Sequence, residues 1–159
     1  MASREVLVAA TLLFGPVAAA QELTLGSVAL RLGASEAATV TLLREQFSVS
    51  AVDGGWAVRS RVPGDTRTPS VGLRVQNGRI HDVSFIWGPG SAPDLDAMFD
   101  QLSHALPAEA ACQVSNVAKP SEGGMVRTLM FRCGASAVRC SSGVWREGTT
   151  ASISIGVEE

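Results

Sequence analysis

The sequence lacks an excess of charge of either sign. It has 13 Lys and Arg residues against 15 Asp and Glu, which gives a formal net charge of −2 at pH 7. A chain without a basic excess exerts no long-range attraction on the phosphates of nucleic acids or on an anionic membrane surface. We therefore expect a protein that binds no nucleic acid.

Motifs that mark common catalytic and cofactor sites are also missing. There is no G-x-S-x-G, no glycine-rich phosphate loop, no H-E-x-x-H and no EF-hand loop. The three cysteines include no C-x-x-C pair, so a redox motif or a zinc ribbon has no support. The sequence thus predicts no cofactor, and it favours a protein that is not an enzyme.

A long apolar run occurs only near the N-terminus, from Val6 to Val17. This run of 12 residues is shorter than the roughly 20 that cross a bilayer, and Gly15-Pro16 interrupts it. Small residues precede Gln21 in the manner of an A-x-A cleavage site. A membrane anchor is the alternative. We expect residues 1–20 to be a secretory signal peptide and 21–159 to form a single exported domain, periplasmic or secreted, with no membrane span after cleavage.

Three cysteines in an exported protein predict one disulfide and one free thiol. A hairpin centred on Lys119–Gly124 would bring Cys112 and Cys133 together on adjacent strands. A bond between Cys133 and Cys140 would have to close over a very short turn, which demands near-ideal geometry. A bond between Cys112 and Cys140 would join strands that are not neighbours. We predict a Cys112–Cys133 disulfide, with Cys140 as a buried free thiol.

The clearest structural prediction concerns Ser70–Gly88, whose pattern is typical of a β-hairpin. Asn77-Gly78 is the pair that best accepts positive φ at both central positions of a type I′ turn. Apolar residues alternate on both sides of this turn, but their parity changes between Ile80 and Val83. Period-2 alternation needs an extra residue for such a change, so we predict a β-bulge at His81-Asp82.

Two helices are expected. The first covers Glu36–Gln46, with Ser35 as its N-cap. The second begins near Ser91 and ends before Pro107. The residues of its apolar face follow helical spacing and are predicted to be buried: Leu95, Met98, Phe99, Leu102 and Leu106.

Alternating apolar residues predict strands elsewhere in the chain. We expect one short strand within Leu23–Leu32 and a hairpin around Asp53-Gly54-Gly55. The last third, beyond Cys112, reads as four strands separated by glycine-containing turns. The predicted fold is α+β, with a single mainly antiparallel sheet of about seven or eight strands and two helices on one face. Each half reads as a helix followed by three or four strands, so two α-β-β-β repeats are one interpretation and an unduplicated chain is the other.

Few residues suggest chemistry. His81 beside Asp82, at the expected bulge, could act as a general base. Asp96, Asp100 and His104 share one helical face and could ligate a metal. In both cases a solvated side chain is the simpler interpretation, and a pair of Asp100 with His104 near the helix C-terminus is the alternative to a metal site.

Tryptophans are the other candidates, because exposed aromatic residues often anchor binding partners. Trp56 and Trp87 continue apolar alternations and are expected in the core. Trp145 lies outside a clean alternation, so we predict that Trp145 and Arg146 form an exposed contact.

Two functions follow from these observations. We favour an exported, non-catalytic domain that binds a protein, a peptide or a cell-envelope component. The expected partner is another exported protein or an envelope protein. The alternative is a small exported hydrolase or metal-dependent enzyme that uses His81 and Asp82, or His104.

Overall fold

The computed structural model describes residues 21–88, 95–106, 111–122, 124–145 and 148–158 of the chain. Residues 95 and 96 are described by their backbone alone. The elements in chain order are β1 (Glu22–Leu25), β2 (Val28–Arg31), α1 (Glu36–Gln46), β3 (Ser48–Val52), β4 (Gly55–Arg59), β5 (Ser70–Gln76), β6 (Arg79–Trp87), α2 (Leu95–Ala105), β7 (Gln113–Ser121), β8 (Gly124–Cys133), β9 (Ser136–Trp145) and β10 (Gly148–Val157).

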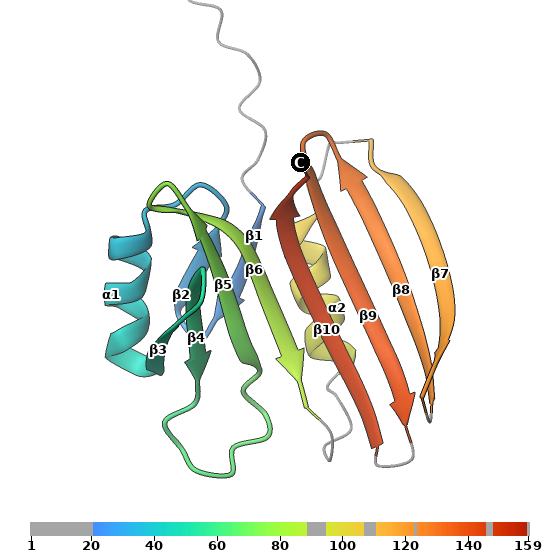
Figure 1. Ribbon diagram of the computed structural model, residues 1–159, viewed down its shortest axis with the longest axis horizontal. Helices are drawn as coiled ribbons and strands as arrows, with labels where there is room; N and C mark the ends of the chain where they lie inside the picture. The colour runs from blue at the N-terminus through green and yellow to red at the C-terminus, as the bar shows by residue number, and fades with distance from the viewer. Residues whose placement is uncertain (1–20, 89–94, 107–110, 123, 146–147, 159) are drawn as a thin grey trace, which may run out of the picture.

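Eight strands form one antiparallel sheet in the order β3-β4-β5-β6-β10-β9-β8-β7 (Figure 1). Each half of the chain supplies a helix and then four strands, and each half runs from its own edge of the sheet towards the centre. The halves meet where β6 pairs with β10, from Trp87 opposite Ala151 to Asp82 opposite Gly156. The expected α+β fold is confirmed.

The N-terminal segment differs from the prediction of one short strand within Leu23–Leu32. It folds back on itself as the hairpin β1–β2, a separate two-stranded sheet in which Leu25 pairs with Val28. The reversal occurs at Gly26, whose φ of +60° lies in the left-handed region that glycine adopts without steric cost. The irregular apolar spacing of this segment reflects the turn.

The Asn77-Gly78 hairpin forms as predicted. Both turn residues have positive φ, 52° and 70°, as a type I′ turn requires. Arg74 pairs with Asp82 while Val75 pairs with Ile80, so His81 is the extra residue of a β-bulge. This extra residue explains why the apolar alternation changes parity between Ile80 and Val83.

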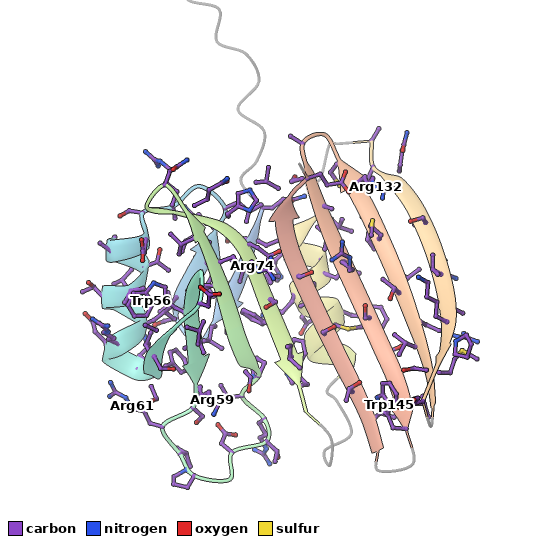
Figure 2. The ribbon with its side chains drawn as sticks, in the orientation of Figure 1. Trp56, Arg59, Arg61, Arg74, Arg132 and Trp145 are labelled. Carbon is purple, nitrogen blue, oxygen red and sulfur yellow. A yellow bond between two sulfur atoms is a disulfide. The ribbon has the colours of Figure 1, made fainter. Side chains whose placement is uncertain are left out.

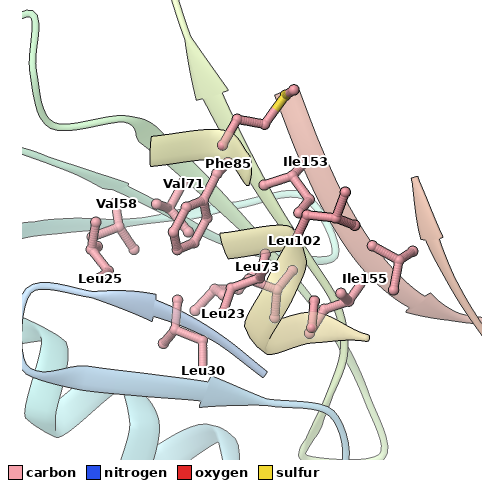
Figure 3. Close-up of a cluster of buried hydrophobic side chains, with 14 of the residues drawn as sticks. Leu23, Leu25, Leu30, Val58, Val71, Leu73, Phe85, Leu102, Ile153 and Ile155 are labelled. Atoms are coloured by element: carbon pink, nitrogen blue, oxygen red, sulfur yellow. The ribbon is translucent and has the colours of Figure 1, made fainter. Parts of the chain in front are cut away.

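One face of the sheet carries the hydrophobic core. We call it the covered face, because the hairpin β1–β2 and both helices pack against it (Figures 1 and 3). Its fully buried members include Leu23 and Leu30 from the hairpin and, from the sheet, Val58, Leu73, Phe85, Ile153 and Ile155. The other side, the open face, carries small and polar residues on its central strands: Gly72, Ser84, Ser154, Ser152 and Ser141.

Helix α1 has the predicted bounds, and the Ser35 side chain accepts a hydrogen bond from the Ala38 amide at 3.5 Å. Helix α2 only partly follows its predicted apolar face. Met98 and Leu102 are buried and Leu106 is half-buried, but Phe99 is 53% exposed, so its predicted burial is wrong. The helix packs on β1, β9 and β10, and the flank that bears Phe99 extends beyond these strands. The predicted cap at Ser91 and the side chain of Leu95 lie outside the described residues.

Candidate functional site

A groove of about 270 Å³ runs between α2 and the covered face of β7, β8 and β9. The helix supplies Met98 and Phe99 as one wall, and Leu129 and Cys140 form an apolar floor. Asn116 and the exposed Arg127 are the polar groups at its edge. The groove exists because α2 covers β9 and β10 but does not extend over β8 and β7.

Strand β7 lies next to this groove at the edge of the sheet (Figure 1). All nine of its residues are exposed, Val114 to 61%. Since β7 buries no side chain, its pairing with β8 provides most of what holds it in place. A second link is the disulfide between Cys112 and Cys133, the pair predicted from the sequence, which joins the two strands just beyond Gln113 and Arg132.

The spacing across this disulfide shows how the backbone of β7 is oriented. The Cα atoms of Cys112 and Cys133 are 4.5 Å apart, the separation of a non-hydrogen-bonded antiparallel pair. Such pairs alternate with hydrogen-bonded ones, so Val114, Asn116 and Ala118 also occupy non-hydrogen-bonded positions opposite β8. Their N–H and C=O groups therefore point away from the sheet, along its free edge.

The free edge is protected at one end only. Pro120 falls in the same alternation, where its missing N–H removes an outward donor, and Lys119 adds a charge beside it. Both residue types discourage the addition of another strand. The stretch Gln113–Ala118 contains neither a charged residue nor a proline. These six residues are open to pairing with a further strand.

His81 and Asp82 lie on the bulge, away from the groove. Asp82 is half-buried, and burial raises the pKa of its carboxyl, although Arg74, Arg139 and His81 lower it. A depression of about 420 Å³ beside His81 is lined by Arg74, Gln76 and Asp53. No hydrogen bond joins His81 to a side chain in the described ranges. The structure thus places this pair near two arginines, with no nucleophile held against the imidazole by a hydrogen bond.

His104 lies exposed in the last turn of α2. Its Nδ1 is 2.7 Å from the backbone oxygen of Asp100, not from the Asp100 carboxylate. The side chain of Asp96 lies outside the described residues. In the parts of the chain that the structure describes, no three His, Cys, Asp or Glu side chains gather as a metal site would require.

The tryptophans take three different environments. Trp87 is buried as predicted, and Trp56 is half-buried, with its Nε1 donating to Glu36 at 2.9 Å and Arg44 over its ring. Trp145 is half-buried on the open face, where its Nε1 donates to Thr150 at 3.0 Å (Figure 2). Its indole lies against Gly143, at which a Cβ would come within 2.6 Å of Nε1. Arg146 lies outside the described residues.

The groove was not foreseen from the sequence. Phe99 and Leu129 read as ordinary core residues, because their spacing fits a buried face. The one usable signal was the stretch after Cys112, where Val114 and Val117 stand among polar residues without a clean apolar face. That pattern is typical of an edge strand.

No protein-family model matches the sequence, and no curated protein matches it either. Neither of the two described helices has the length and apolar character needed to cross a membrane.

Proposed function

We propose that this chain is an exported, non-catalytic binding domain that adds an extended segment of a partner protein to the free edge of β7. The observation that carries the proposal is the row of outward N–H and C=O groups at Val114, Asn116 and Ala118, placed beside an apolar groove. Strand addition of this kind obtains affinity from main-chain hydrogen bonds and specificity from pockets for alternate side chains.

The groove supports a particular kind of segment. Alternate side chains of an added strand point to the covered face, where Phe99 and Leu129 offer apolar contact. Arg127 is the charged side chain among the residues that line the groove, so an acidic residue at one end of the segment would be favoured. We therefore infer a partner segment with alternating apolar residues, no proline and a nearby carboxylate.

Export accords with two features of the chain. Residues 1–20 have the pattern of a secretory signal. A disulfide such as Cys112–Cys133 persists in an oxidising compartment. The same bond holds the strand to which the partner would be added.

Selection of displayed nine-residue peptides on the full exported chain tests the proposal. We expect the selected peptides to alternate apolar and polar residues, and we expect the amides of Val114, Asn116 and Ala118 to gain protection from hydrogen exchange in the complex. Peptides that bind while leaving these three amides unprotected would refute the site. Failure to enrich any such pattern would refute the function.

A matched pair of variants at Asn116 distinguishes the contribution of the backbone N–H to binding from that of the side chain. Asn116→Pro removes one outward N–H but leaves the hydrogen bonds to β8 intact, whereas Asn116→Ala keeps the N–H and removes only the side chain. We expect Asn116→Ala to bind a selected peptide and Asn116→Pro to lose it. Thermal melts of both variants check that the fold is retained.

A further inference from the structure

Gln21, the residue just before β1, is buried, and the polar atoms of its side chain have no hydrogen-bond partner among the described residues. Only 6% of its surface is exposed. Neither Oε1 nor Nε2 of its side chain has a hydrogen-bond partner in the described part of the chain. A buried amide without hydrogen-bond partners is costly, so a reaction that removes one of its polar atoms would be favourable at this position.

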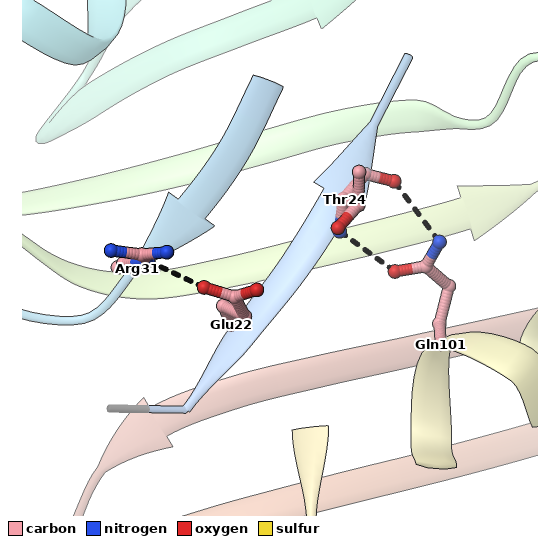
Figure 4. A network of polar contacts seen from close by, with 4 residues as sticks. All are labelled: Glu22, Thr24, Arg31 and Gln101. Carbon is pink, nitrogen blue, oxygen red and sulfur yellow. Dashed lines mark hydrogen bonds and ion pairs between the residues drawn. The ribbon is translucent and has the colours of Figure 1, made fainter. Parts of the chain in front are cut away.

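The backbone around Gln21 is firmly held. Its carbonyl accepts a hydrogen bond from the Leu32 amide at 3.4 Å. Three residues further on, the Gln101 side chain of α2 forms hydrogen bonds with the N–H and the C=O of Thr24, at 2.8 and 3.0 Å (Figure 4). An ion pair between Glu22 and Arg31 adds a third attachment. These contacts hold the start of β1 in place, directly after Gln21.

Cleavage of the expected signal peptide would leave a free α-amino group on Gln21 itself. We propose that Gln21 then cyclises to pyroglutamate, which rests on the export part of the proposed function. The α-nitrogen attacks Cδ of its own side chain, an N–Cδ bond forms, and the Cδ–Nε2 bond breaks. The α-nitrogen gives up one proton, which Nε2 takes as it leaves as ammonia. The product is a neutral five-membered lactam, and no oxidant or reductant is needed.

The reaction suits a largely buried residue. It removes Nε2, one of the two unpartnered side-chain atoms, and it replaces an α-ammonium by a neutral lactam N–H. Both changes lower the desolvation cost at this position. Cyclisation thus converts an unfavourable N-terminus into one that suits a buried strand end.

The mass of the N-terminal peptide of the exported protein tests the proposal. We expect the chain to begin at residue 21, to have lost one ammonia, and to be blocked to Edman degradation. A chain that begins at Gln21 with its amide intact would overturn the modification and leave the export proposal standing. A chain that begins at another residue would overturn the modification alone, and a chain that retains residues 1–20 would overturn both.

A matched variant shows whether the amide is the reacting group. Gln21→Glu has the same length but a poorer leaving group, so we expect it to be exported, to begin at residue 21 and to remain open to Edman degradation. We also expect it to melt at a lower temperature than the cyclised protein, because it would place a carboxylate and an ammonium where Gln21 is buried. An equal melting temperature would contradict the account of why the site favours the lactam.

Discussion

Cys112 and Cys133 lie directly across from each other, with Cα atoms 4.5 Å apart and a disulfide between them, at the end of the ladder that joins β7 to β8. This bond fastens β7, whose nine residues are all exposed, to β8, in which Cys133 is buried. The geometry that admits the disulfide also sets which backbone groups of β7 point outward. One feature therefore both holds and orients the candidate binding edge.

Removal of the disulfide should release β7 before it unfolds the domain. The bond spans 21 residues, so the Cys112→Ser, Cys133→Ser double variant should lose about 3 kcal/mol of unfolding free energy in the chain-entropy model. Hydrogen exchange should accelerate most at the β7 amides that pair with β8, such as Ser115 and Val117. Cys140→Ala is the control and should leave exchange in β7 unchanged. Uniform acceleration across the sheet would contradict the local role of the bond.

Phe99 and Leu102 should respond differently to truncation, although both belong to the apolar pattern of α2. Leu102→Ala should cost about 2–5 kcal/mol, because it opens a cavity in the core. Phe99→Ala should cost less than about 1 kcal/mol, since its ring is half exposed, but should weaken binding of a selected peptide. Urea unfolding measures the first effect and titration the second. Equal losses of stability would place Phe99 in the core after all.

Asp82 should make the protein less stable as the pH rises. Burial raises the pKa of its carboxyl in the folded state, against the opposing effect of Arg74 and Arg139. The folded chain then holds this proton more tightly than the unfolded chain, so stability falls from about pH 4 up to the raised pKa. The variant Asp82→Asn lacks this pH dependence. Its unfolding free energy, compared with that of the wild type, should therefore be higher at pH 7 than at pH 3. The opposite ordering in urea unfolding would show that attraction to the arginines dominates.

Cys140 should be inert in the folded protein. Burial raises the pKa of its thiol to about 11, so the reactive thiolate is scarce at pH 8. A thiol reagent should modify it only as fast as the protein opens, and addition of urea should accelerate the reaction. Rapid modification of the native protein would contradict the closed floor of the groove. A selected peptide that fills the groove should slow the reaction further.

Some features could be predicted from the sequence because neighbouring residues determine them. Asn77-Gly78 specifies its own turn, the parity change at Ile80 reveals the bulge, and the polar stretch between Cys112 and Cys133 identifies the hairpin that joins them. The groove could not be predicted from neighbouring residues. Phe99 has the spacing of a core residue, and its exposure depends on where α2 ends relative to strands that come later in the chain. Whether β7 is an edge strand likewise depends on the order of the whole sheet.

The central claim is that the outward backbone groups of β7 bind the partner, and the affinity of one selected peptide for Asn116→Pro and Asn116→Ala tests it most directly. The two variants differ by one N–H at the free edge and by the proline ring. We predict that Asn116→Pro binds at least about tenfold more weakly than Asn116→Ala, a difference of about 1.4 kcal/mol, while both melt at similar temperatures. Equal affinities in two folded variants would contradict strand addition at β7.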